Sequence, residues 1–208
     1  FDDLRVIRPR EGWPNKIANK SAANAEFIIK KAKIFNNFDD AVSDLNFLIA
    51  TSVRERFLNK NHYFEFNQLI NNISKYSKIG IVFGPEKSGL TNANISKCDC
   101  IFSLPILKNK LSLNLSQSIL IICYEYSKLK NKSFTKNNNN KFDIATKKEF
   151  NYLMEHLYNS LKKNGFLNPP EKRKSMFINI QNMFTKAKFS SQEIRTFRGI
   201  IKSLGNQR

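Results

Sequence analysis

The chain has 208 residues, 41% of them hydrophobic, and a formal net charge of +18 at pH 7. A chain of this length can bury one sizeable α/β core and carry a smaller appendage. Its sequence has no apolar run near the roughly 18 residues that span a bilayer, which argues against helical membrane spans.

The positive charge is unevenly distributed. Residues 1–131 carry 19 Lys and Arg against 12 Asp and Glu, whereas residues 132–208 carry 16 against 5. Lys and Arg neutralise phosphates and release counterions, so charge concentrated at one end favours a polyanionic partner such as a nucleic acid. A compositional origin stays open, because the chain also contains 27 Asn and is rich in Lys, Ile and Phe, as A+T-biased genomes encode.

The cysteines and histidines do not form a metal-ligand pattern. Cys98, Cys100 and Cys123 contain no CxxC pair, and His62 and His156 are far apart in the sequence. A structural zinc site needs about four suitably spaced nitrogen or sulfur ligands, so no metal is expected. The odd number of cysteines does not support disulfides, which fits a reducing cytoplasm and predicts cysteines that serve as small buried hydrophobes.

The first 131 residues alternate short apolar runs with helical patterns. Apolar runs predict strands at 4–7, 47–51, 79–83 and 100–104. Apolar residues at helical spacing predict helices at 21–33, 38–45, 64–73 and 112–126, the last of them apolar almost all round. Because the strands are apolar on both faces and separated by helices, the expected fold is α/β, with a mostly parallel sheet and helices on both faces.

Residues 132–145 are predicted to link this first domain, at 1–131, to a small helical extension at 146–208. The segment from Lys132 to Lys141 is polar and patternless. Beyond it, helical patterns cover 146–163, 170–187 and 190–204, and the last opens with a capping-box pattern. The extension is too short for a large core of its own, so it is expected to pack on the first domain or on a dimer partner.

A glycine-containing loop, Gly84 to Thr91, follows the clearest predicted strand. In α/β proteins, ligands collect just beyond the carboxyl ends of strands. Gly84 and Gly89 permit a tight turn and a close approach of backbone groups to a ligand. A P-loop needs a lysine after its second glycine, where this chain has Leu90, so a nucleoside-triphosphate site is not favoured. Taken alone, such a loop is as often structural as functional.

Two further strand ends carry small or polar residues. Thr51 and Ser52 close one strand, Leu104 closes another, and Ser112 and Asn114 begin the following helix. Taken singly, the hydroxyls are ordinary turn residues, and Ser112 is a plain helix N-cap. Taken together, three strand-end loops that offer backbone and small polar groups suit a nucleoside-like ligand better than a phosphate.

The order and spacing of these segments resemble the second and third motifs of the SPOUT superfamily, in its SpoU/TrmH branch of RNA 2′-O-methyltransferases. The matching letters are F-G-x-E-x-x-G-L at 83–90, Leu-Pro at 104–105 and S-L-N-L at 112–115. The whole chain, including RPREGWPN at 8–15 and PPEKR at 169–173, looks most like the TrmJ-like enzymes. Those enzymes methylate the ribose 2′-OH at position 32 of tRNA anticodon loops.

This resemblance implies a trefoil-knotted sheet, S-adenosyl-L-methionine as cofactor and S-adenosyl-L-homocysteine as product. It also implies a tRNA substrate, no metal, and a homodimer that builds each active site from both subunits. The organisation of the reacting site is carried over to Glu86, Ser112 and Asn114. Cofactor contacts are carried over to Thr51, Ser52, Val53, Gly84, Leu104, Leu111, Ser112 and Leu113.

Cationic residues in two places are candidates for RNA binding. Arg54 and Arg56 follow the Thr51 strand end and can contact phosphates, although solvated surface arginines are an equally good interpretation. The basic tail is the better candidate, because RNA is recognised largely through its shape and backbone. Its densest cations are Lys172, Arg173, Lys174, Arg195 and Arg198.

One family motif does not occur in the sequence. The N-x-G-x-x-x-R motif, whose arginine is credited in the family with activating the 2′-OH, is expected upstream of Phe1. The resemblance therefore predicts an N-terminally truncated chain that methylates poorly or not at all. The alternatives are a non-catalytic RNA-binding protein that retains the knotted fold, or a related rRNA 2′-O-methyltransferase.

Overall fold

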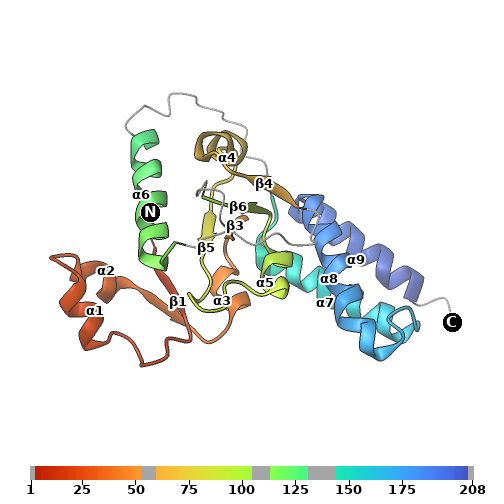
Figure 1. Ribbon diagram of the computed structural model, residues 1–208. Coiled ribbons are helices and arrows are strands. Elements are labelled where there is room, and N and C mark those ends of the chain that lie inside the picture. The colour runs from red at the N-terminus through yellow and green to blue at the C-terminus, as the bar shows by residue number, and fades with distance from the viewer. Residues whose placement is uncertain (1–2, 53–59, 105–112, 131–143, 206–208) are drawn as a thin grey trace. The chain divides into compact units, whose positions relative to one another are not determined.

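The computed structural model describes residues 3–52, 60–104, 113–130 and 144–205 (Figure 1). The chain divides into two compact units, residues 1–44 and 45–208. The first unit contains β1 (Arg5–Ile7), α1 (Lys16–Ser21), α2 (Glu26–Lys31), β2 (Lys33–Phe35) and α3 (Phe38–Val42).

In the first unit, β1 and β2 form a parallel two-stranded sheet in which Val6 pairs with Ile34. The helix predicted at 21–33 is wrong in its extent. A turn separates α1 from α2, and within it Ala23 and Asn24 adopt positive φ angles of 45° and 71°. Apolar spacing that continues across this break hid it, although Asn24 is a residue type that favours turns and tolerates a positive φ.

The second unit is built around a four-stranded parallel sheet. Its strands are β3 (Phe47–Thr51), β4 (Asn61–Tyr63), β5 (Ile79–Val82) and β6 (Cys100–Phe102), in the order β4-β6-β3-β5. The predicted mostly parallel α/β fold is therefore confirmed. The trefoil knot stays a prediction, because the loops 53–59 and 105–112 lie outside the described residues.

The central strand β3 is buried on both faces. Phe47 and Ile49 pack in a cluster with α4 (Phe66–Ile73) and with Ile122 of α6 (Leu115–Lys130). Leu48 and Ala50, which point to the opposite face, are fully buried as well. An interior strand with this double burial must be apolar throughout, which is why its bounds were readable from the sequence.

Helix α6 contributes a single buried side chain, Ile122, to the core among its described residues. Ile119, Leu120, Ile121 and Tyr124 are exposed. Cys98 and Cys100 are buried as predicted, but Cys123 is exposed, so that part of the cysteine prediction is wrong. Successive helical residues point about 100° apart, so the position after Ile122 turns away from the core.

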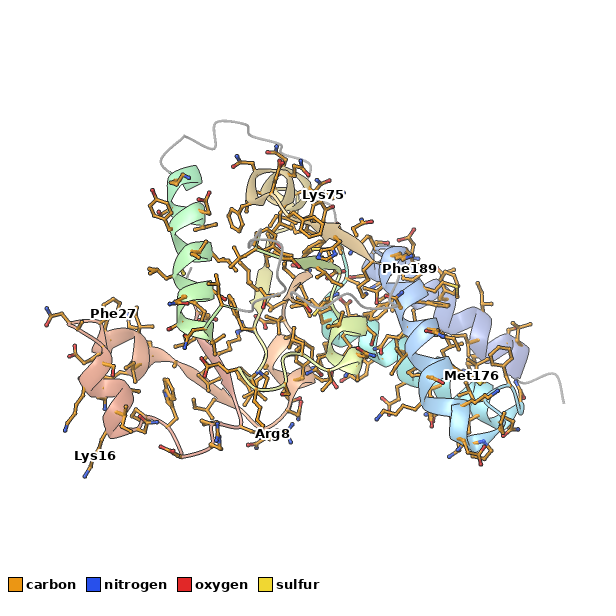
Figure 2. The ribbon with its side chains drawn as sticks, in the orientation of Figure 1. Arg8, Lys16, Phe27, Lys75, Met176 and Phe189 are labelled. Atoms are coloured by element: carbon orange, nitrogen blue, oxygen red, sulfur yellow. The ribbon has the colours of Figure 1, made fainter. Side chains whose placement is uncertain are left out.

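The C-terminal helices form a core of their own and also pack on the sheet. They comprise α7 (Lys147–Lys163), a 3-10 turn η1 (Pro170–Lys172), α8 (Arg173–Lys186) and α9 (Ser191–Gly205). Leu153, Met154 and Ile194 are buried among several phenylalanines. One of these is Phe189, which is labelled in Figure 2. Helix α8 contacts α5 (Asn92–Lys97), and Ser96 Oγ lies 3.1 Å from Gln181 Oε1. The expectation that the extension packs on the first domain is confirmed for this pair of helices.

Helix starts in the extension follow their sequence signals. The predicted capping box at 190–193 is present, since Glu193 N donates to Ser190 Oγ and Ser190 N donates to Glu193 Oε2. A second capping box joins Thr146 and Glu149 at the start of α7. Within the described ranges, no helix is long and apolar enough to cross a membrane.

A buried charge cluster connects the sheet to the extension. Asp99, immediately before β6, is 7% exposed and accepts Lys147 Nζ at 2.7 Å and Lys188 Nζ at 2.5 Å. Leu48 N also donates to this carboxylate at 2.6 Å. Burial alone would raise the pKa of Asp99, but the charges of Lys147 and Lys188 outweigh it and hold the pKa below its usual value. The cluster anchors the amino ends of β3 and β6 to the extension.

Candidate cofactor site at the carboxyl edge of the sheet

The parallel register brings the carboxyl ends of all four strands of the second unit to one edge. Thr51 pairs with Phe102, Tyr63 pairs with Phe102, and Ala50 pairs with Val82. The described residues that directly follow β3, β5 and β6 therefore lie at the same edge of the sheet, whose strands are labelled in Figure 1. The three strand ends that the sequence singled out are thus neighbours in space.

Hydroxyl groups connect these strand ends. Thr51 Oγ1 donates to Val82 O at 2.8 Å, which joins β3 to β5. Ser103 Oγ donates to Ser52 O, and Ser52 N donates to Phe102 O at 3.2 Å, so Ser52 is tied to the end of β6 on both sides. These bonds fix the backbone at an edge where ordinary ladder hydrogen bonding stops.

The glycine loop after β5 folds back on itself. A Cβ atom at Gly84 would lie 2.3 Å from the backbone carbon of Gly89 and from the nitrogen of Leu90. Gly89 has φ +65°, a conformation that L side chains rarely adopt, and its N–H donates to Pro85 O at 2.7 Å. The two glycines are therefore required for different reasons, one for close approach and the other for its dihedral angle.

Glu86 and Asn114 meet at the start of α6. Leu115 N donates to Glu86 Oε1 at 3.3 Å, so the loop after β5 reaches the helix that follows β6. Asn114 Oδ1 accepts Ser116 N at 2.8 Å and Ser116 Oγ at 2.6 Å. Asn114 thus caps the helix, which begins at Leu115, so the predicted start of this helix at 112 is wrong by three residues.

The predicted contacts divide according to what the structure describes. Thr51, Ser52, Gly84 and Leu104 lie at the carboxyl edge, and Leu113 lies two residues before α6. The remaining predicted residues of the site and its flank lie outside the described residues; they are Val53, Arg54, Arg56, Leu111 and Ser112.

In the basic tail, four of the five predicted RNA contacts are exposed. They are Lys172, Lys174, Arg195 and Arg198. Arg173 differs, because it is half buried and its Nε donates to Leu167 O at 3.2 Å. Its guanidinium therefore also holds the connection between α7 and α8.

Sequence reasoning missed two residues at this edge, His62 and Ser103. His62 Nε2 lies 2.7 Å from Ser103 Oγ, and its ring stacks on Phe64 with 4.4 Å between centroids. Burial lowers the pKa of His62. The signal for Ser103 was available, since it is a polar residue directly after a buried apolar strand. His62 gave no such signal, because Asn61-His62-Tyr63 has no strand-like apolar pattern.

The polar groups assembled at the described part of the edge are backbone amides and carbonyls, hydroxyls, the His62 imidazole, the Asn114 amide and the Glu86 carboxylate. This set can accept hydrogen bonds from, and donate them to, a neutral nucleoside-like group, and it offers no cationic cradle for a phosphate. Over the described ranges, no group of three or more His, Cys, Asp or Glu side chains could hold a metal ion.

The fold and this edge define an α/β protein in which the ends of parallel strands and a glycine loop gather at one edge of the sheet. The SpoU rRNA Methylase family matches residues 1–124, and the tRNA methyltransferase TrmJ C-terminal domain matches residues 148–208. The chain belongs to the SpoU methylase family.

Similar proteins and a solved structure match nearly the whole chain. The tRNA (cytidine-2′-O-)-methyltransferase TrmJ of Methanocaldococcus jannaschii is 32% identical over 97% of this chain and 87% of its own length. An uncharacterized tRNA/rRNA methyltransferase of Haemophilus influenzae is 29% identical over 88% of this chain and 76% of its own length. The crystal structure of TrmJ from Z. mobilis ZM4 matches with a TM-score of 0.87 and 30% identity, covering 98% of this chain and 87% of that one.

Proposed function

We propose that this protein is an S-adenosylmethionine-dependent tRNA 2′-O-ribose methyltransferase that acts in the cytoplasm on position 32 of the anticodon loop. The observation that carries the proposal is the meeting of the β3, β5 and β6 strand ends at one edge, in a chain of the SpoU family. The match of residues 148–208 to a TrmJ C-terminal domain supports tRNA as the substrate. Support for a ribose target comes from the M. jannaschii relative, whose name specifies a 2′-O-methyl group.

The cofactor is held mainly by backbone groups at the carboxyl edge. The contacts are Thr51, Ser52, Val53, Gly84, Leu104, Leu111, Ser112 and Leu113. Apart from Glu86, the polar groups described at the edge are uncharged, which fits an adenosine moiety. Gly84 has no side chain, so the loop can close into a tight turn whose backbone groups are available to the cofactor. S-adenosylmethionine supplies the methyl group, and S-adenosylhomocysteine is the leaving group. No metal takes part.

The remaining work of the chain is alignment of the 2′-oxygen and removal of one proton. Glu86, Ser112 and Asn114 organise the reacting site. The contact of Glu86 with Leu115 N, together with the capping of α6 by Asn114, supports this role, because it couples the loop after β5 to the segment after β6.

The protein functions as a homodimer that uses the exposed apolar side chains of α6. Leu120 is 69% exposed and Tyr124 is 59% exposed, and both lie in the apolar run at 119–124 of this helix. Burying such side chains contributes roughly 1.5–3 kcal/mol each. A Leu120→Lys variant is therefore expected to shift the protein toward the monomer in light scattering after size-exclusion chromatography.

The chain is divided by role into the knotted first domain at 1–131, the linker at 132–145 and the extension at 146–208. The basic extension holds the tRNA. The exposed cations Lys172, Lys174, Arg195 and Arg198 contact the phosphate backbone, with Arg173 beside them. Arg54 and Arg56 contribute near the active site.

Two measurements test the function. Isothermal calorimetry with S-adenosylhomocysteine must show binding, and its absence contradicts the methyltransferase proposal. Methyl transfer from labelled S-adenosylmethionine to tRNA transcripts, with the site mapped by its resistance to alkaline cleavage, must place the methyl group at position 32. Cofactor and tRNA binding without transfer, in a protein that also carries the N-x-G-x-x-x-R motif, would favour a non-catalytic RNA-binding protein, whereas transfer to rRNA alone would favour the rRNA enzyme.

A further inference from the structure

Three side-chain hydrogen bonds join neighbouring strands at the carboxyl edge of the sheet. Two of them run from His62 of β4 to Ser103 after β6, and from Ser103 Oγ to Ser52 O after β3. The third is separate and joins Thr51 Oγ1, one residue before Ser52, to Val82 O of β5. Together with the backbone between Thr51 and Ser52, these bonds form a line across all four strands in their spatial order, β4-β6-β3-β5.

The direction of these bonds is determined by the supply of protons. A serine hydroxyl has one proton, and that of Ser103 is donated to Ser52 O. The Ser103 oxygen must then accept from His62, so the imidazole carries its proton on Nε2. Stacking on Phe64 restricts the ring in this orientation. Burial lowers the pKa of His62, which keeps the ring neutral at neutral pH with Nδ1 unprotonated.

We infer that His62 and Ser103 are positioning residues for the cofactor site, which set the backbone of Ser52 and Leu104 through this hydrogen-bonded line. This inference rests on the proposed function. Ser52 and Leu104 are proposed to contact the cofactor through their backbones. The orientation of these backbone groups therefore depends on the residues that hold the chain in place around them. Ser103 holds one of these residues by its hydroxyl and adjoins the other in the chain, and His62 orients that hydroxyl.

Four substitutions separate positioning from packing. Ser103→Ala removes the donor to Ser52 O, and His62→Leu removes the donor to Ser103. His62→Gln retains an N–H donor of similar reach and should restore the line. Ser96→Ala is the matched control, because Ser96 is also a buried serine beside β6 but lies at its other end, bonded to Gln181.

The measurement is S-adenosylhomocysteine affinity on the full chain, read beside thermal stability. Ser103→Ala and His62→Leu should weaken binding about five- to tenfold, the equivalent of one lost and one misdirected hydrogen bond. His62→Gln should bind within about twofold of the parent protein, and so should Ser96→Ala even where it lowers the melting temperature.

Three results would overturn the inference. One is unchanged affinity in Ser103→Ala, and another is an equal loss in Ser96→Ala, which would make the effect one of general stability. In the third, nitrogen-15 NMR of the histidine rings shows the proton on Nδ1 of His62; the spectrum is simple because the chain has two histidines. The parent protein failing to bind S-adenosylhomocysteine would instead overturn the proposed function, and the inference with it.

Discussion

The two ends of strand β6 are built from different chemistry. Its amino end carries a buried carboxylate, Asp99, held by Lys147 and Lys188. Its carboxyl end carries Ser103, held by neutral hydrogen bonds to His62 and Ser52. Charges at one end attach the helical extension with long-range attraction in a dry environment. Neutral groups at the other end leave an edge that can hydrogen-bond the neutral adenosine part of a cofactor.

The largest expected effect comes from removing the charge at the amino end. Asp99→Asn retains an acceptor for Leu48 N but leaves Lys147 and Lys188 without their counter-charge. We expect a loss of about 3–5 kcal/mol in the free energy of unfolding, measured by urea denaturation, because an uncompensated buried charge is costly. Glu125→Gln, which breaks the exposed pair with Lys128, should cost no more than about 1 kcal/mol. Equal losses would contradict the contrast.

At the carboxyl end, the sharpest steric change is Gly84→Ala. Its Cβ would lie 2.3 Å from the backbone of Gly89 and Leu90, so the loop must open. We expect loss of S-adenosylhomocysteine binding in calorimetry and a destabilisation of about 1–3 kcal/mol. Gly199→Ala is the control, because a Cβ there meets nothing within 4 Å. It should raise stability by up to about 1 kcal/mol, since alanine favours a helix. Retained binding in Gly84→Ala would show that the loop is not part of the site.

The extension attached by Asp99 is expected to carry the RNA contacts. Lys172→Glu with Lys174→Glu should weaken tRNA binding about tenfold or more and flatten its salt dependence, by close to one unit of log–log slope for each phosphate that is no longer neutralised. Arg173 is left intact, because it also holds Leu167 O. Lys16→Glu with Lys20→Glu makes the same change of charge in the first unit. An equal effect of both pairs in filter binding would indicate bulk charge and not a site.

The smallest expected effect is on the pH dependence of stability, through Asp99 at the amino end of β6. The pKa of Asp99 is lowered in the folded protein, so its contribution to stability is present above the ordinary carboxyl value of 3.8 and is lost as the pH falls through the folded pKa. Thermal unfolding of the parent protein should therefore become steeply acid-sensitive below about pH 4, and Asp99→Asn should show a shallower dependence. Parallel profiles would mean that other carboxylates dominate acid unfolding.

The sequence predicted the interior of the sheet better than its margins. The range 47–51 was predicted to the residue, because a strand buried on both faces is apolar from end to end. Strand β4 was missed, because it pairs only with β6 at the sheet edge and needs no apolar pattern. The break at Ala23 and Asn24 was missed for the opposite reason, since a regular apolar spacing continued across it.

The candidate site shows a similar division. Residues that stand directly after buried strands, such as Thr51 and Gly84, were found because chain position alone places them at the edge. The contacts between site residues were not predicted, although Glu86 itself was. Glu86 with Leu115 and His62 with Ser103 come together only through the tertiary fold, 29 and 41 residues apart. The buried pair of Asp99 and Lys188, 89 residues apart, was beyond sequence reasoning for the same reason.

The attachment of Asp99 bears on how the protein can be dissected. The family matches end at 124 and resume at 148, which invites expression of the two portions as separate modules. Cutting there would leave the sheet portion with a bare carboxylate beside Leu48 and would uncover Phe47, over whose ring Lys188 lies 4.5 Å from the centroid. The extension would in turn expose two lysines that have lost their counter-ion. Residues 45 to 208 accordingly form one compact unit, and we expect separation of its two portions to destabilise both.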